Sequence, residues 1–135
     1  METKKDFTIL VVEDEDMLLK AITRKLELAG KKVIPCISGR VALEYLNQSQ
    51  EIPDAIWLDF YLKDMNGLEF MYELKKDENR ANIPVLVVSN SASTDKVTKM
   101  LALGAKKYLL KAESKLDDLV SEISSIMNGK GGALT

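Results

Sequence analysis

The feature that most restricts the fold of this chain is an alternation of short apolar runs with longer segments of helical periodicity. The apolar runs have the length and the β-branched character of buried strands, and they are Thr8–Val12, Lys32–Ile37, Ala55–Leu58, Val85–Val88 and Lys107–Leu110. After each run, apolar residues recur three or four positions apart, as in a helix that buries one face. Continuous apolar strands joined by helices indicate a parallel sheet with helices on both faces.

One proline indicates the order of the strands in this sheet. Pro35 lies inside the second apolar run and has no N–H to donate to a neighbouring strand. The second strand is therefore expected at an edge of the sheet. The flavodoxin-like order 2-1-3-4-5 has its second strand at that edge. We predict an α/β fold with a flavodoxin-like, doubly wound, five-stranded parallel sheet in this order and five helices.

The length and composition of the chain predict one domain in the cytoplasm. A chain of 135 residues is the size of a single domain, expected here over residues 1–128, and the glycine-rich segment 129–135 (GKGGALT) is expected to form a flexible tail. The N-terminal segment METKKDFTILVVEDED turns acidic where an export signal would continue apolar, and no apolar stretch approaches the length of a membrane span. A single cysteine, Cys36, cannot form an intrachain disulfide, as expected in a reducing compartment.

The charged residues and one absent residue type exclude several functions. The chain has 19 Lys and Arg against 21 Asp and Glu, a net charge of −2, which predicts neither a nucleic-acid partner nor binding to an anionic membrane. It contains no histidine. This absence excludes Ser–His and Cys–His catalysis and histidine-ligated zinc. The chemistry must therefore use carboxylates, hydroxyls and lysines.

Polar residues follow four of the predicted strands directly. Glu13 and Asp14 follow the first strand, Asp59 the third, Ser89 the fourth and Lys111 the fifth. In a sheet of this type ligands bind outside the carboxyl ends of the strands, near the switch point between the first and third strands. We therefore expect carboxylates, a hydroxyl and an ammonium group to meet in one crevice.

This set of groups predicts a divalent cation next to a phosphoryl group. Neighbouring carboxylates repel each other unless a cation balances them, and oxygen ligands alone favour a hard cation such as Mg²⁺ or Mn²⁺. Lys111 and Ser89 suit the oxygens of a phosphoryl group, and Asp59 between them can act as a nucleophile. Taken singly, Lys111 could be a solvated lysine and Ser89 a turn residue. Tyr108 alone is more typical of a core aromatic than of a switch.

At this point the chain resembles the receiver domain of two-component response regulators, in particular the stand-alone, chemotaxis-regulator-like members. The likeness runs from about Phe7 to Met127. ILVVEDE resembles the first strand with its acidic pair, and LDFYLKDMNGLEF resembles the phosphoacceptor strand and its loop. PVLVVSNSA resembles the fourth strand, and GAKKYLLKA resembles the fifth.

The resemblance implies a role for each of the matching residues. Asp59 is the phosphoacceptor in this pattern. Asp14, Asp59 and the main-chain carbonyl of Tyr61 ligate Mg²⁺, and Glu13 acts through water. Lys111 contacts the phosphoryl group, and two residues form the switch: the hydroxyl residue Ser89 and the aromatic residue Tyr108.

The same resemblance implies partners. A sensor histidine kinase or a phosphotransfer protein donates the phosphoryl group, because the chain has no histidine of its own. A downstream protein then binds the face made by the fourth helix, the fifth strand and the fifth helix. We expect no enzymatic activity beyond self-phosphotransfer and autodephosphorylation, and no output domain.

Three other functions are alternatives to a phosphorylatable receiver. An aspartyl phosphatase needs a second acid at the position of Tyr61, and a flavodoxin needs a hydroxyl-rich loop where this chain has EDED. A degenerate receiver that binds its partner without phosphorylation is the third alternative.

Four residues depart from the usual receiver pattern. Lys63 and Ala112 stand where the family usually has proline, and Asn90 stands where alanine is common. In the family the peptide before the second proline is cis, whereas a cis bond before alanine costs about 3 kcal/mol more than a trans bond. The geometry of the Lys111–Ala112 peptide is therefore left open. Tyr61 is large for its position and is expected to affect hydrolysis of the acyl phosphate.

Overall fold

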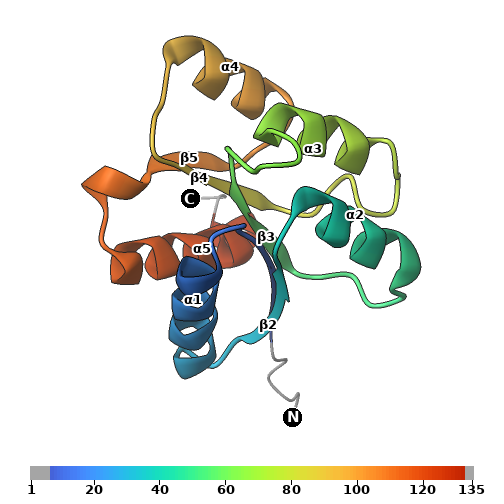
Figure 1. Ribbon diagram of the computed structural model, residues 1–135. Helices are drawn as coiled ribbons and strands as arrows, with labels where there is room; N and C mark the ends of the chain where they lie inside the picture. Colours follow the sequence, from blue (N-terminus) through green and yellow to red (C-terminus); the bar gives the residue numbers. More distant parts are fainter. Residues whose placement is uncertain (1–6, 133–135) are drawn as a thin grey trace.

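A computed structural model describes the backbone of residues 7–132 and the side chains of residues 7–127. The five strands are β1 (Thr8–Val12), β2 (Lys32–Cys36), β3 (Ala55–Asp59), β4 (Val85–Ser89) and β5 (Lys107–Leu110). They form one parallel sheet in the order β2-β1-β3-β4-β5, which confirms the predicted order (Figure 1). β3 ends on Asp59 and β4 ends on Ser89, so both functional candidates are part of the sheet.

Five helices cover the two faces of this sheet. They are α1 (Asp16–Leu28), α2 (Gly39–Gln48), α3 (Gly67–Lys75), α4 (Thr94–Ala102) and α5 (Leu116–Gly132), with a short 3₁₀ turn, η1 (Lys111–Glu113), before the last one. α1 and α5 lie on one face, and α2, α3 and α4 lie on the other (Figure 1). The doubly wound α/β architecture is therefore confirmed.

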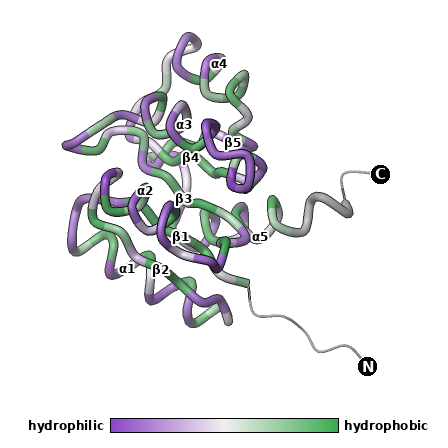
Figure 2. Tube along the Cα trace, turned by 90° about the vertical axis from the view of Figure 1, so that its right-hand side faces the viewer, coloured by the Kyte–Doolittle hydropathy of each residue, from purple (hydrophilic) through white to green (hydrophobic). Residues whose placement is uncertain are grey.

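The strands alternate their side chains between two apolar layers. In β1, Leu10 and Val12 pack toward α2, α3 and α4, whereas Ile9 and Val11 pack toward α1 and α5. β3 divides its residues in the same way, and its Trp57 faces α1 and α5. In Figure 2 hydrophobic positions gather along the central strands and hydrophilic ones recur on the helices and loops. Burial on both faces fixes the strands, and with them the positions of their carboxyl ends.

Pro35 occupies the edge position that the sequence predicts. β2 pairs with β1 alone among the described strands, and Pro35 lies opposite Val11 in the register. The missing N–H therefore costs no hydrogen bond within the sheet.

The last helix extends further than expected. α5 runs to Gly132, beyond the domain boundary expected at residue 128. Glycine lowers helix propensity, but it keeps the N–H that continues the hydrogen-bond ladder. Residues 133–135 of the expected tail lie outside the described residues. None of the described helices has both the length and the apolar character needed to cross a membrane.

Candidate functional site

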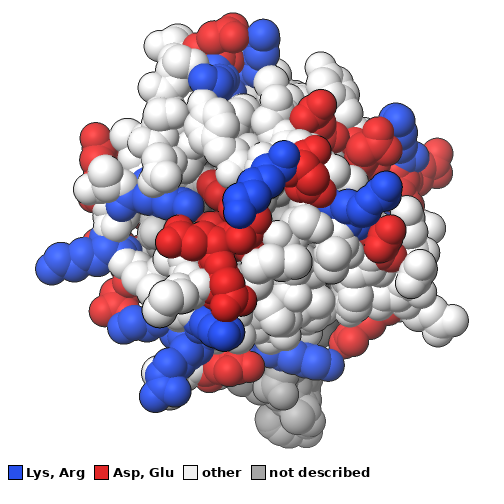
Figure 3. Space-filling model, in the orientation of Figure 1, with Lys and Arg blue, Asp and Glu red and all other residues white. Residues whose placement is uncertain are grey.

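The carboxyl ends of β1 and β3 bring three carboxylates together. Glu13, Asp14 and Asp59 each offer one oxygen within 4.8 Å of the others, and we call these residues the acidic trio. Glu13 is 1% exposed and Asp59 is 5% exposed, whereas Asp14 is half-buried. Figure 3 shows acidic side chains gathered near the centre of the molecular face, where β1 leads into α1, with basic side chains at their margin.

Lys111 is the basic partner of two members of the trio. Its Nζ lies 3.2 Å from Glu13 Oε1 and 3.5 Å from Asp59 Oδ1. The lysine begins the turn η1, and its peptide bond to Ala112 is trans, because residues 7–132 contain no cis peptide. With this trans peptide, the ammonium group lies against both buried carboxylates.

The buried position makes Asp59 reluctant to ionise. Burial in the apolar surroundings of β3 is the main cause that raises its pKa, and the nearby Glu13 carboxylate raises it further. Lys111 opposes both effects, and the net result is a pKa of about 6. Two of the three carboxylates thus share one ammonium group, and a divalent cation would complete the balance of charge of the trio.

This raised pKa predicts a pH-dependent effect of Asp59→Asn on stability. The native state holds the Asp59 proton more tightly than the unfolded chain does. The ionised group therefore costs stability above about pH 6, and the cost disappears as the pH falls toward 3.8. At about pH 7.5 without metal, the free energy of unfolding of Asp59→Asn should exceed that of the wild type by at most roughly 3 kcal/mol.

Urea unfolding in a chelator over a pH series measures this difference. It should vanish below about pH 4 and shrink when Mg²⁺ is added, because the cation then stabilises the ionised wild type. Glu15→Gln, which changes an exposed acid, is the control. An advantage of the asparagine variant that is independent of pH would contradict the assignment of the raised pKa.

The loop after β3 is attached to the site through Asp14. The Lys63 N–H donates to Asp14 Oδ2 over 2.6 Å, a bond that a proline in this position could not make. The next residue, Asp64, accepts hydrogen bonds from the Gly39 and Arg40 N–H groups at the start of α2, at 3.1 and 2.9 Å. The loop that carries Tyr61 is therefore fixed between β1 and α2.

The remaining predicted site residues meet at the loop between β4 and α4. Ser89 is fully buried, and its Oγ accepts a hydrogen bond from the Ser91 N–H. The half-buried Tyr108 donates its hydroxyl to the Ser91 carbonyl, and its ring centroid lies 6.0 Å from that of Phe60. Tyr108 thus already packs against the core.

The sequence offers no reason to single out Ser91. It lies in the run SNSAST, in which every residue except Ala92 suits a turn or a helix start. Tyr61 is 43% exposed, and its hydroxyl accepts a hydrogen bond from Ser91 Oγ. Only the folded loop brings Ser91 next to three predicted site residues.

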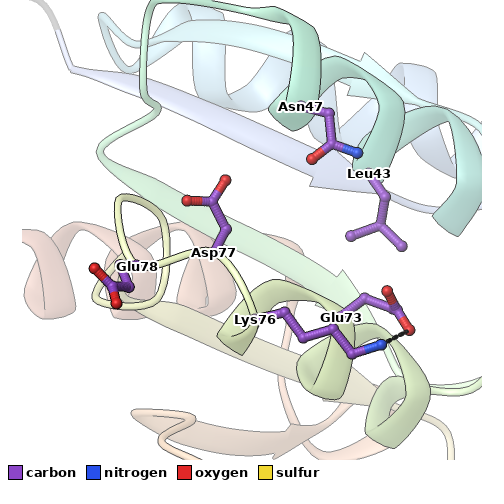
Figure 4. Close-up of a pocket in the computed structure, with 6 residues that line it drawn as sticks. All are labelled: Leu43, Asn47, Glu73, Lys76, Asp77 and Glu78. Atoms are coloured by element: carbon purple, nitrogen blue, oxygen red, sulfur yellow. Dashed lines mark hydrogen bonds and ion pairs between the residues drawn. The ribbon is translucent and has the colours of Figure 1, made fainter.

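A hollow elsewhere on the molecule is separate from this site. It has a volume of about 580 Å³ and lies between α2 and the end of α3 (Figure 4). Its lining consists of Leu43, Asn47, Glu73, Lys76, Asp77 and Glu78. Lys76 and Glu73 pair with each other at 3.0 Å, and the hollow contains none of the residues predicted to act on a phosphoryl group.

Comparison with known proteins agrees with this geometry. The sequence profile of the response regulator receiver domain matches residues 9–124. The transcriptional regulatory protein PrrA of Mycobacterium leprae is 32% identical over 127 residues, which cover 94% of this chain and 52% of PrrA. The protein-glutamate methylesterase/protein-glutamine glutaminase of Treponema pallidum is 34% identical over 119 residues, which cover 82% of this chain and 28% of that protein. The chain spans about half the length of PrrA and less of the second relative.

Solved structures show the same fold. The receiver domain of the Francisella response regulator 1452 is 25% identical, with a TM-score of 0.81 and coverage of 93% of this chain and 99% of that one. The phosphorylated cyanobacterial phytochrome response regulator RcpA is 27% identical, with a TM-score of 0.78 and coverage of 93% and 94%. A CheY-like receiver domain protein from Methanospirillum hungatei, 23% identical, covers 96% of this chain and shares the fold with a TM-score of 0.84.

The fold and the acidic trio at its strand ends define the class, a signalling module of two-component systems. The chain belongs to the response regulator receiver domain family. Receiver domains bind Mg²⁺ at an acidic pocket, and the trio fits that ion because it offers hard oxygen ligands with a single lysine to balance them. The resemblance to receiver domains that the sequence motifs indicate is thus confirmed.

Proposed function

We propose that this chain is a phosphorylatable receiver in which Asp59 accepts a phosphoryl group, with Mg²⁺ or Mn²⁺ in the acidic trio. The observation that carries this proposal is the buried Asp59 carboxylate, paired with Lys111 at 3.5 Å and next to two further carboxylates. The likeness to RcpA, a response regulator described as phosphorylated, supports it. The donor would be the phosphohistidine of a sensor histidine kinase or of a phosphotransfer protein.

Asp59 supplies the nucleophile for the transfer. A carboxylate oxygen of Asp59 attacks the phosphorus, and the bond between phosphorus and the histidine nitrogen breaks as the new P–O bond forms. The nitrogen keeps the electron pair, and because the second ring nitrogen of the phosphohistidine carries a proton, the donor histidine leaves as a neutral imidazole. When bound, the metal neutralises charge on the phosphoryl oxygens. Asp14, Asp59 and the Tyr61 carbonyl would hold it, with Glu13 acting through water.

Lys111 and Ser89 would bind the other phosphoryl oxygens. The Lys111 ammonium already contacts Asp59, so it lies where charge on the phosphoryl group would develop. The Ser89 hydroxyl would turn toward the phosphoryl group in order to donate to it, and this turn would break the bond that its oxygen accepts from the Ser91 N–H. Its movement would leave space for Tyr108 to turn further inward.

The signal would then be read on the face formed by α4, β5 and α5. Tyr108 lies on β5, and Leu101 on α4 is 44% exposed and offers apolar surface on this face. We propose that a downstream protein binds there, and that it does so in the cytoplasm. The intact trio and its lysine favour this function over a degenerate receiver that works without phosphorylation.

The direct test is incubation with Mg²⁺ and a small acyl or amido phosphate, followed by intact-protein mass spectrometry. The wild type should gain the mass of one phosphoryl group, and it should gain none when a chelator removes the metal. An unchanged mass with the metal present would contradict the proposal.

The metal assignment predicts saturable Mg²⁺ binding that depends on Asp14. Trp57, the single tryptophan, lies on β3 two residues before Asp59, so its fluorescence can report binding. Titration of the wild type should saturate, whereas Asp14→Ala should bind at least about tenfold more weakly because a charged ligand is lost. Calorimetry checks the same affinities without a fluorophore, and Asp95→Ala on α4 is the matched control. Equal affinities in wild type and Asp14→Ala would exclude the trio as the metal site.

A further inference from the structure

Ser91 contacts three different site residues through its three polar groups. Its N–H donates to Ser89 Oγ at 3.2 Å, and its carbonyl accepts from the Tyr108 hydroxyl at 2.9 Å. Its own hydroxyl donates to the Tyr61 hydroxyl at 3.3 Å. The two backbone bonds involve the proposed switch residues, whereas the side-chain bond reaches the residue two positions after the phosphoacceptor.

Tyr61 is held in place by neighbours from different parts of the chain. Its ring meets the buried Phe60 ring edge-on, with 4.8 Å between centroids, and Lys96 Nζ of α4 lies 5.3 Å from its centroid. Hydrogen bonds from Lys96 and from Ser91 lower the pKa of its phenol. An exposed aromatic ring that is held in this way has a defined position, two residues along the chain from Asp59.

We propose that Ser91 is a positioning residue that couples Tyr61 to the switch residues Ser89 and Tyr108. This inference rests on the proposed function. When the Ser89 hydroxyl turns to the phosphoryl group it releases the Ser91 N–H, and Ser91 shifts. Its carbonyl and its hydroxyl then carry the change to Tyr108 and to Tyr61 together.

One consequence is a link between the signal and the lifetime of the acyl phosphate. In hydrolysis, water attacks the phosphorus, the bond from phosphorus to the Asp59 oxygen breaks, and Asp59 regains its carboxylate. The products are inorganic phosphate and a proton that passes to solvent. A Tyr61 ring held by Ser91 restricts the approach of water, so release of the ring should speed this step.

The test compares Ser91→Ala, Tyr61→Phe and the double variant. Each single change removes the bond between the two hydroxyls and should shorten the lifetime of the acyl phosphate about threefold, as for one hydrogen bond of modest strength. The double variant should hydrolyse no faster than Tyr61→Phe alone, because Ser91→Ala removes only an interaction that Tyr61→Phe has already removed. Ser91→Thr keeps a hydroxyl and should restore the wild-type lifetime. Ser121→Ala and Tyr72→Phe, exposed positions on α5 and α3, are the matched controls.

A second readout separates positioning from a general loss of structure. The chain has four tyrosines, so their ring NMR signals can be assigned by single Tyr→Phe changes. With Mg²⁺ and beryllofluoride, a phosphoryl mimic, the wild type should shift the signals of both Tyr61 and Tyr108. In Ser91→Ala the Tyr108 signal should still shift, and the Tyr61 signal should not.

The outcomes distinguish the two proposals. A wild type that neither takes up a phosphoryl group nor responds to the mimic contradicts the proposed function, and the inference with it. A responsive wild type whose Tyr61 signal shifts equally in Ser91→Ala overturns the coupling alone. Additive effects of the two single changes on the lifetime would overturn it as well.

Discussion

Asp59→Asn is expected to abolish phosphoryl incorporation completely. An amide has no anionic oxygen with which to attack phosphorus, so the loss should reach the detection limit of mass spectrometry. Glu13 and Asp14, the other members of the trio, are not expected to accept the phosphoryl group instead of Asp59. Glu13 is 1% exposed and accepts hydrogen bonds from Lys111 and from the Glu15 N–H, whereas Asp14 is bound to the Lys63 N–H.

Asp59→Asn also tests the identity of the phosphoacceptor cleanly, because the variant is expected to fold and a loss of reactivity cannot then be due to misfolding. Asparagine has nearly the shape of aspartate, and the raised pKa of Asp59 means that loss of its charge should stabilise the metal-free fold. A well-folded, more stable and unreactive Asp59→Asn would therefore identify the acceptor. Glu15→Gln at the start of α1 should take up the phosphoryl group as the wild type does. Persistent incorporation in Asp59→Asn would place the acceptor elsewhere.

The part of the site that could be predicted is the part that parallel-sheet geometry determines. Apolar runs that end in Asp14, Asp59 and Lys111 had to place those residues at one edge once the strand order was known. Pro35 indicated that the second strand lies at an edge, and the flavodoxin-like pattern supplied the rest of the order. These predictions depend on periodicity and topology, which local sequence encodes directly.

The contacts made by loops could not be predicted in the same way. The donor in the hydrogen bond from Lys63 to Asp14 is a backbone N–H, so the identity of the side chain at position 63 does not predict this bond. Ser91 reaches Tyr61 and Tyr108 across 30 and 17 positions of the chain, and the path of the loop alone decides which polar group meets which partner. Lys63 departs from the usual proline of the family pattern, and in the structure its N–H donates to Asp14.

Lys111→Ala is expected to separate metal binding from the response to a phosphoryl group. The lysine contacts carboxylate oxygens of Glu13 and Asp59. The same two carboxylates lie where the cation and the phosphoryl group would bind. A charged hydrogen bond is worth about 1.5–3 kcal/mol, so the affinity for beryllofluoride should fall at least about tenfold. Mg²⁺ should bind as tightly as in the wild type or more tightly, because a competing positive charge has gone.

The same change has a cost for the metal-free protein. Without Lys111 the buried Glu13 and Asp59 lose their cationic partner, and a buried charge left unpaired costs about 3 kcal/mol. Thermal unfolding of Lys111→Ala should therefore occur at a lower temperature than in the wild type, and Mg²⁺ should recover most of the difference because it supplies the missing positive charge. This recovery also verifies that the variant is folded when the mimic is added.

Lys115→Ala is the matched control, since Lys115 is an exposed lysine four residues further along the chain. It should keep the stability, the Mg²⁺ affinity and the mimic response of the wild type. If Lys111→Ala responds to beryllofluoride as the wild type does, the lysine serves only to balance the buried carboxylates. Binding of the phosphoryl oxygens would then depend on Ser89 and the metal. The 3.5 Å contact between Lys111 and Asp59 in the wild type would stabilise the fold and play no part in signalling.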